Sequence, residues 1–542
     1  MQTVSQDWKN AHKQTLLNES FVEVSLDIAD PESVADATAT DNGSVYISNT
    51  WHIAKDITKN LLPYCTLEQN LWLLDGGKKI IPESDYGESG YPWDATSGYI
   101  GDVLSDDECT FSDKMPVITV GFSWPFYSPI PGITITWGAT HGEFAEQFDV
   151  RVYNGDTLVV EKEVVDNRSV TSFVMMDITN YDRIEIRVKK WCLPHHRARI
   201  DEIFVGLRKV YSKTELFDYT YTQSVDPLST SLPQTKINFS IDNVSGEYNP
   251  YNESGLSKYL MERQEVKSRY GLKLADGSIE WIKGGTFYLS EWYAKQNGLS
   301  ADFAARDLLE FLSDKLGDHN QTVQPRTFGE LISYVLGMAK LPMRRDTTPY
   351  IIIPDWFSDG SISTTAPLPD DTLANCLQLI ANAAECVLYQ DREGILRIEP
   401  LRSDVTDYSI DSFNSYSKSE ITVSKPIKQV VVKVYSYSQG ADGSISSTTS
   451  EVAVDVGEVG ETITVDNPLV DTVERARSIG EWVGTHLGHR LTLDSSWRAD
   501  VRLDALDIVT NKNAYDTQSV RMTEVKYSYS GAFRGTGKGK VI

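Results

Sequence analysis

The chain has 542 residues and a formal net charge of −26, from 51 Lys and Arg residues against 77 Asp and Glu residues. This length exceeds one ordinary hydrophobic core and predicts several domains. Hydrophobic residues make up 40% of the chain and aromatic residues 10%, which indicates a folded, strand-rich protein and excludes general disorder. The negative charge argues against a general nucleic-acid-binding surface, because phosphate is bound by basic side chains. It is typical of a solvated acidic surface that keeps a large protein soluble.

Targeting signals and cysteine patterns point to a protein made in the cytoplasm. Residues 1–20 lack the apolar segment of a secretion signal, and the chain has no apolar run of about 18 residues, so we expect no membrane anchor. The five cysteines are scattered and never in C-x-x-C spacing, which argues against a disulfide framework or a zinc site.

The N-terminal segment predicts a helix over about residues 4–18 and then a strand over 21–28, where apolar and polar residues alternate. This strand needs partners, and the residues after it have a pattern of their own. We therefore expect its partners in the block 237–312, which predicts a first barrel split by an inserted domain. Its first part is 1–62 and its second part is 209–316.

The insert, residues 63–208, predicts an all-β sandwich. Apolar and polar residues alternate over 118–123 and 184–189, and Asn154-Gly155 is typical of a two-residue hairpin turn. Short strands at regular spacing, without a helical period, favour a jelly roll. In its general strand pattern the insert resembles galactose-binding-like domains.

The block 237–312 predicts successive antiparallel strands. Alternation over 237–242 and 266–274 is typical of half-buried strands, and Asp276-Gly277 and Asn297-Gly298 supply the residues that tight hairpins need. A short helix from Arg306 to Leu312 then closes the unit.

Residues 317–402 predict a small α+β domain. Thr327 and Glu330 have capping-box spacing, in which the hydroxyl accepts from the third amide and the carboxylate reaches back. A helix to about Ala339, a second helix over 371–384 and a hairpin around the turn 391–394 complete the pattern.

Residues 403–542 predict a second barrel with a packed helix. Strands are expected at 428–438, 461–465, 501–509 and 519–529, with a Gly/Ser-rich loop at 439–448 and a helix over 471–486. The tail 531–540 reads as a flexible basic terminus. The complete expectation is a mainly β fold with two antiparallel β-barrels, an inserted β-sandwich and a small α+β domain.

Motif searches give little support for catalysis or cofactor binding. The tail resembles a phosphate-binding loop only superficially, because Lys538 is followed by Gly539, and the chain has neither a G-x-S-x-G nor an H-E-x-x-H motif. His486 and His489 have helical spacing without a completing ligand. The acids at 106–108 are expected on a solvated loop. We expect no enzyme activity, no cofactor and no metal.

Glycan contact is the remaining chemistry that the insert suggests. Aromatic faces at strand ends or loops can stack on sugar rings, and the candidates are Trp124, Phe126, Tyr127 and Trp191. The alternative interpretation is that these side chains pack in the core or between domains.

The sequences of several segments resemble those of the central tail-hub proteins of bacteriophages of Gram-positive bacteria, also called tail-associated or baseplate-hub proteins. The segments are FSIDNVSGEYNP at 239–250, GTFYLSEW at 285–292 and ARDLLEFL at 305–312, with further support from YCTLEQNLWLLDG at 64–76. None of them is a catalytic signature. Their order along the chain carries the resemblance.

The resemblance implies a structural hub at the tip of a virion tail, made in the bacterial cytoplasm. It implies a homotrimer whose two barrels per copy match a sixfold tube, contact with distal tail or tube proteins, and passage of DNA through the ring without specific binding. The sequence stops soon after its last predicted strand, so we expect the tip, spike or fibre protein to be a separate chain. The alternatives are an adhesin that binds a host-surface glycan through the insert, and a glycan hydrolase.

Overall fold

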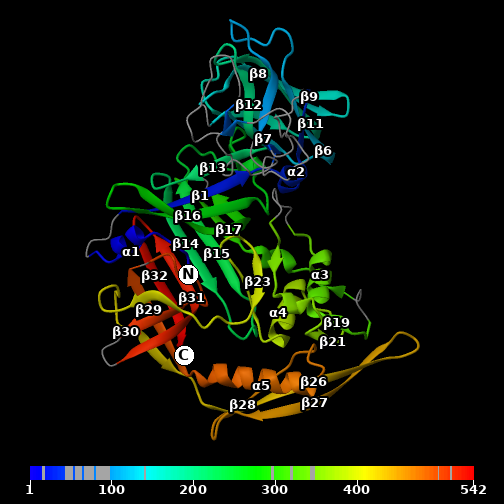
Figure 1. Ribbon diagram of the computed structural model, residues 1–542, viewed down its shortest axis with the longest axis vertical. Helices are drawn as coiled ribbons and strands as arrows, with labels where there is room; N and C mark the ends of the chain where they lie inside the picture. The colour runs from blue at the N-terminus through cyan, green and yellow to red at the C-terminus, as the bar shows by residue number, and fades with distance from the viewer. Residues whose placement is uncertain are drawn as a thin grey trace.

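The computed structural model describes residues 1–14, 19–42, 53–54, 98–139, 142–294, 298–317, 322–341, 348–498, 500–512 and 516–542, with the backbone of β3 (Tyr64–Cys65) and β4 (Lys79–Ile80). The fold is mainly β, as predicted. Figure 1 shows three parts: a sandwich at one end, a large sheet in the middle, and a group of helices and smaller sheets at the other end. Residues 66–76 of the segment 64–76, and Asn297 of the turn at Asn297-Gly298, lie outside the described residues.

Thirteen strands form one continuous sheet that spans nearly the whole sequence. In order across the sheet, its main path consists of β13 (Leu207–Tyr211), β1 (Ser20–Ile28), β16 (Glu265–Lys273), β17 (Ile279–Ala294), β18 (Ser300–Arg306), β15 (Gln234–Asp242), β14 (Leu216–Ser224), β31 (Thr517–Tyr529), β32 (Phe533–Val541), β29 (Leu491–Arg498) and β25 (Glu420–Val423). Strand β30 (Ile508–Lys512) pairs with β31 and with β24 (Val405–Ile410), off the main path.

This arrangement corrects the prediction of two barrels, because none of the sheets formed by described residues closes on itself. The two strand groups that were expected to form separate barrels are joined where β14 pairs with β31, from Tyr219↔Tyr529 to Ser224↔Glu524. Strands β13 and β25 therefore remain at opposite ends of one open sheet. Alternation of apolar residues specifies a buried face, but it does not specify which edges meet.

The N-terminal strand β1 pairs where the sequence predicted. It runs antiparallel to β16 from Ser20↔Leu272 to Leu26↔Val266, and its other edge pairs with β13. The helix before it, α1 (Gln6–His12), is shorter than predicted and is capped by the Ser5 hydroxyl. Trp8 on this helix is buried in the core of the large sheet.

The inserted sandwich has two sheets that share one apolar core. Its four-stranded sheet consists of β10 (Thr171–Ile178), β7 (Ile130–Trp137), β12 (Arg197–Phe204) and β5 (Tyr99–Leu104). The five-stranded sheet consists of β2 (Thr38–Asp41), β6 (Val117–Phe126), β11 (Tyr181–Trp191), β8 (Ala145–Asn154) and β9 (Thr157–Val164). Strand β2 and the short helix α2 (Pro31–Asp36) precede the boundary predicted at residue 63 and pack on this unit.

The small α+β unit follows the sequence pattern closely. Helix α3 (Phe328–Met338) has both hydrogen bonds of the predicted capping box, and α4 (Leu373–Ala383) is capped by Thr372. Strands β22 (Val387–Gln390) and β23 (Leu396–Glu399) form the predicted hairpin, with β20 (Ile351–Ile352) parallel to β23 and β19 (Arg326–Thr327) paired with β21 (Ser363–Thr364). The segment predicted as a helix near Arg306 is the 3-10 helix η5 (Leu308–Leu312), and two further 3-10 turns are η4 (Ser257–Tyr259) and η7 (Asp355–Phe357).

The second barrel was predicted to contain the strands at 428–438 and 461–465 and the helix over 471–486. These elements belong instead to a separate unit that packs with α3 and α4. A separate sheet contains β27 (Ile445–Asp455), β26 (Ile427–Gln439) and β28 (Glu461–Val465), and α5 (Val473–Gly488) packs on it. The core of this sheet is continuous with that of α3 and α4. The Gly/Ser-rich segment is a shorter loop than predicted, because β27 begins at Ile445.

The C-terminal tail is also corrected, from a flexible terminus to the strand β32. Its glycines recur at every second position, so they lie on one face of the strand. A Cβ atom at Gly535 would lie 2.7 Å from a ring carbon of Trp497, and one at Gly537 would lie 2.4 Å from the carbonyl of Glu524. Glycine thus permits β32 to pass close to a buried indole.

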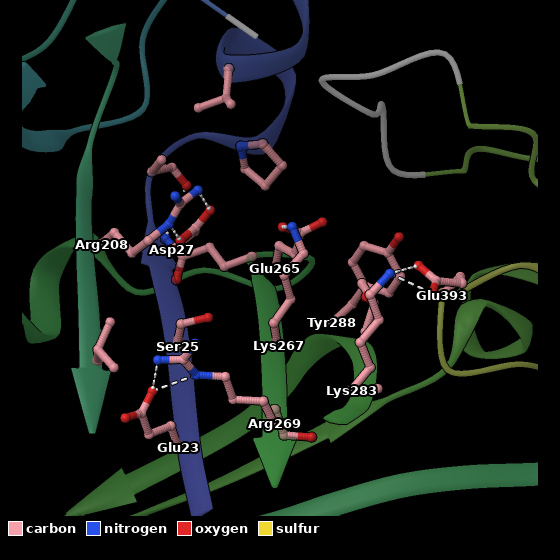
Figure 2. A pocket seen from close by; sticks show the side chains of 18 of the residues that line it. Glu23, Ser25, Asp27, Arg208, Glu265, Lys267, Arg269, Lys283, Tyr288 and Glu393 are labelled. Carbon is pink, nitrogen blue, oxygen red and sulfur yellow. Dashed lines mark hydrogen bonds and ion pairs between the residues drawn. The ribbon is translucent and has the colours of Figure 1, made fainter. Parts of the chain in front are cut away.

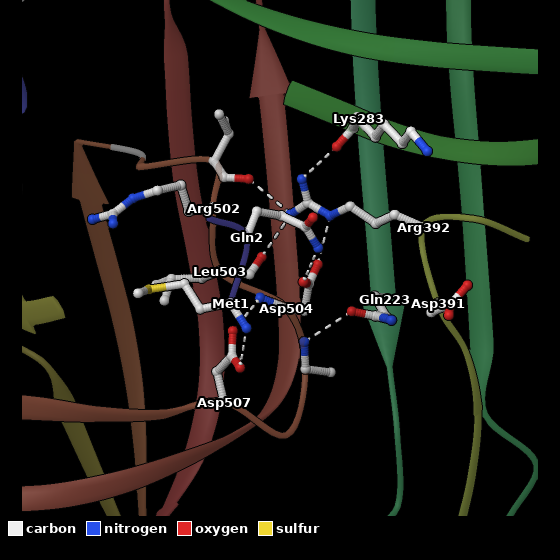
Figure 3. A network of polar contacts seen from close by, with 12 residues as sticks. Met1, Gln2, Gln223, Lys283, Asp391, Arg392, Arg502, Leu503, Asp504 and Asp507 are labelled. Carbon is white, nitrogen blue, oxygen red and sulfur yellow. Dashed lines mark hydrogen bonds and ion pairs between the residues drawn. The ribbon is translucent and has the colours of Figure 1, made fainter. Parts of the chain in front are cut away.

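A buried arginine joins the turn of the α+β unit to the two strand groups of the large sheet. Arg392, in the turn between β22 and β23, donates from Nε to Asp504 at 2.7 Å. Its other nitrogens donate to the carbonyls of Lys283, Val501 and Leu503 at 2.7 to 3.0 Å (Figure 3). Burial alone would lower the pKa of Arg392, but Asp504 together with Tyr221, Tyr270 and Tyr527 outweighs burial and holds that pKa above its usual value.

Neighbouring groups reinforce this junction. Gln223 on β14 donates to the carbonyl of Gln390 and accepts from the amide of Ala505 at 2.8 Å. At the same place the α-amino group of Met1 lies 2.6 Å from Asp507. The turn of the α+β unit is therefore fixed to both halves of the large sheet.

We expect Arg392→Met to lower the free energy of unfolding by about 3–5 kcal/mol, because the buried Asp504 would lose its cationic partner and the carbonyls of Lys283 and Val501 would lose the guanidinium donor. Denaturant unfolding followed by tryptophan fluorescence measures this change. Lys283→Met is the matched control, because it removes an exposed ion pair with Glu393 and should cost about 1 kcal/mol or less. Equal, small losses for both variants would contradict this role of Arg392.

Candidate functional site

A groove of about 440 Å³ lies where the sandwich, the large sheet and the α+β unit meet. Strands β1 and β16 form its floor, Val34 and Phe204 contribute from the sandwich side, and the turn between β22 and β23 contributes Glu393. Figure 2 shows that charged side chains of both signs point into it from these strands.

Charged side chains in the groove form ion pairs, two of which join neighbouring strands. Arg208 on β13 holds Asp27 with two hydrogen bonds, from Nε at 2.7 Å and from Nη2 at 2.9 Å. Arg269 donates from Nε to Glu23 at 2.6 Å, and Lys283 contacts Glu393.

These ion pairs place charges of both signs side by side, which weakens the attraction of the groove for phosphate or for a cation. Among the described residues that line it, none is a histidine or a cysteine. The groove is better suited to fixing the junction than to chemistry on a ligand.

Four histidines form two pairs in the sequence, His195 with His196 and His486 with His489. His195 Nε2 is 2.9 Å from Asp107, and His196 Nδ1 is 3.1 Å from Glu143. The rings of His486 and His489 are 6.3 Å apart, and burial together with the nearby Arg521 lowers the pKa of His486 to about 4. Across the described ranges, no three His, Cys, Asp or Glu side chains gather closely enough to hold a metal ion.

The acidic segment at 106–108 is organised by its own loop. Asp106 accepts from the amides of Glu108 and Thr110 and from the Thr110 hydroxyl. The hydrogen bonds from Thr110 lower the pKa of Asp106.

Within the part of the chain that the structure describes, no helix is long and apolar enough to cross a membrane.

The four aromatic residues considered for glycan binding occupy two kinds of position. Trp124 is 48% exposed and Tyr127 is 71% exposed, on and just after the end of β6, so both present ring surface to solvent. Phe126 is only 5% exposed and packs against Phe122 at 5.6 Å between ring centroids.

Trp191 is fully buried at the end of β11, between the two sheets of the sandwich. Its ring meets Trp137 edge to face at 6.1 Å, and its Nε1 donates to Glu143 at 2.9 Å. Arg199 holds the same carboxylate at 3.2 Å. A ring without exposed surface offers no face to a sugar, so Trp191 has a packing position and the accessible candidates are Trp124 and Tyr127.

The comparisons with known proteins give structural neighbours only. No model of a protein family matches the sequence, and no curated protein matches it either. Among solved structures, the 43 kDa tail protein of prophage MuSo2 from Shewanella oneidensis is 13% identical with a TM-score of 0.41, over 61% of this chain and 95% of that one.

Two further structures match over a similar share. A tail protein from Neisseria meningitidis is 11% identical with a TM-score of 0.42, over 61% of this chain and 93% of that one. The prophage tail protein gp18 from Listeria monocytogenes is 11% identical with a TM-score of 0.39, over 61% and 91%. At TM-scores below 0.5 these likenesses carry no argument about function.

We expect opposite behaviour from two tryptophan substitutions in the sandwich. Trp124→Ala should leave the unfolding midpoint nearly unchanged, because the ring is half exposed, whereas Trp191→Ala should cost about 3–5 kcal/mol through the cavity it leaves. Thermal unfolding monitored by near-UV circular dichroism compares the two. A large loss from Trp124→Ala would show that this ring supports the fold instead of an open surface.

Proposed function

We propose that the chain is a structural baseplate or tail-hub protein that forms a trimeric ring at the distal end of a phage tail tube. The ring would join the tube to the tip and surround the DNA exit channel. The observation that supports this most is the architecture of the large sheet, in which two strand groups from distant parts of the sequence are fused through β14 and β31.

An open sheet with two strand groups is still compatible with the symmetry of a trimeric ring. Each copy carries two strand groups, so three copies present six, and a ring of three can meet a sixfold tube on one side and a threefold tip on the other. Closed barrels are not required for this match. The resemblance of the sequence segments 239–250, 285–292 and 305–312 supports the same interpretation. These segments form strands and turns of the first strand group.

The charge of the chain supports a channel that does not hold DNA. A net charge of −26 repels the phosphate backbone, so acidic walls would let DNA pass without sticking. In this proposal the partners are distal tail or tube proteins and a separate tip, spike or fibre protein, and the chain is located at the virion tail tip. Its host would be a Gram-positive bacterium.

A host-wall adhesin is the second candidate, and the exposure of Trp124 and Tyr127 at the end of β6 favours it. In Figure 1 the sandwich projects from the rest of the molecule, as a surface that meets a host glycan would. Binding to a wall-glycan array that disappears with Trp124→Ala would support the adhesin. Binding that Trp124→Ala leaves unchanged would argue against it.

We expect the purified chain to have the mass of a trimer in native mass spectrometry, and antibodies against it to label the distal end of purified tails in electron micrographs. Both results follow from a hub that closes a ring on the tube. A stable monomer that is absent from purified tails would contradict the proposed function.

A further inference from the structure

The hairpin of β26 and β27 is an unusual extension of the molecule. In Figure 1 it runs out beyond α3, away from the large sheet. Every residue from Ser446 to Glu451 on β27 is exposed, and successive residues of a strand point to opposite faces. We call the distal part of the hairpin, residues 434–450, the arm. Its β27 strand is open to solvent, whereas its β26 strand contacts the rest of the molecule, because the Tyr437 hydroxyl donates to the carbonyl of Pro468 at 3.0 Å.

The arm also lacks the features by which edge strands avoid pairing with other chains. Bulges, prolines and charged side chains normally protect such edges. Across 427–455, all of which the structure describes, β26 and β27 pair without a register shift, and no described strand pairs with the outer edge of β27. From Val434 to Ser450 the sequence has no proline, and its one charged residue is Asp442 in the turn.

An isolated two-stranded hairpin is marginally stable in water, and the contacts of the arm with the rest of the molecule come from its β26 strand. An arm of this kind is stabilised when its free edge gains a further strand, because the unpaired backbone groups of β27 then find partners. The arm thus has the geometry and composition of a β-pairing surface.

A second open edge lies at the other side of the molecule. Strand β25 is the last strand of the large sheet and pairs only through β29 on its main path, from Glu420↔Asp494 to Val423↔Leu491. Ile421 and Val423 lie on one face of it and are 59% and 57% exposed. In Figure 1, β29 lies on the left of the molecule and the arm extends to the lower right.

The distribution of charge on the chain indicates which partner can approach these edges. Two copies of a chain with a net charge of −26 repel each other over most of their surface. The arm is nearly neutral, and from Ser412 to Val423 the charges of Lys418 and Glu420 cancel. These two neutral edges are places where like-charged copies can approach closely.

We propose that the arm of one copy pairs, edge to edge, with β25 of a second copy of this chain. Because the two edges differ and lie at opposite sides, the contact is head to tail, and repetition of a head-to-tail contact closes a ring when the rotation permits. This inference rests on the proposed function, and it names the surface through which the trimer forms.

Two variants of the full chain test the contact by native mass spectrometry. In the armless variant, residues 436–448 are replaced by Asn-Gly, which joins the register partners Tyr435 and Thr449 through a tight hairpin turn. The edge-blocked variant carries Ile421→Lys and Val423→Lys. The lysines reduce the negative charge of the chain, so a loss of assembly cannot come from added repulsion. Val244→Lys, at an exposed loop position, is the matched control.

We expect trimers from the unaltered chain and from Val244→Lys, and monomers from each of the two variants alone. An equimolar mixture of the variants should give dimers, because one arm and one β25 edge remain intact between them. Circular dichroism and the thermal midpoint check that each variant is folded.

Trimers that persist in either folded variant overturn this inference and leave the proposed function standing. A mixture that remains monomeric overturns the head-to-tail pairing. An unaltered chain that is monomeric overturns the proposed function and this inference together.

Discussion

The structure depends on the buried guanidinium of Arg392. A charge in a low-dielectric interior is tolerated only when its donors are satisfied, and here one carboxylate and three backbone carbonyls satisfy them. Those acceptors come from β17 of the first strand group and from the segment before β30 in the second. Arg392 therefore links the turn of the α+β unit to both strand groups, which β14 and β31 also join directly.

The sandwich is attached to this frame differently. Both of its connections to the large sheet, β1 on the way in and β13 on the way out, are strands of that sheet and neighbours in it. The paired charges of the groove lie at this junction, where Arg208 holds Asp27 across the two strands. An insert anchored through adjacent strands can vary in its outer loops while the sheet beneath it keeps its register.

Local features of the fold were predictable from the sequence, and long-range pairing was predictable only in part. The capping box at Thr327, the β22–β23 hairpin and the pairing of β1 with the 237–312 block follow from spacing and alternation. Closure of the barrels was predicted wrongly, because alternation identifies a buried face without naming the neighbouring strand. Trp191 had no sequence signal that distinguished a core position from an exposed one, and Arg392 lies in a turn, DREG, that contains no motif.

The far ends of the sequence meet inside the finished molecule, since the hydroxyl of Tyr529 donates to the carbonyl of Ser20 across 509 positions. A fold with such a high contact order cannot complete its central sheet while the chain is still being synthesised. The sandwich, whose strands are close in sequence, can form first, and β14 must then keep one edge unpaired until β31 has been synthesised. Efficient production of this protein will therefore depend on what protects the nascent chain during that interval.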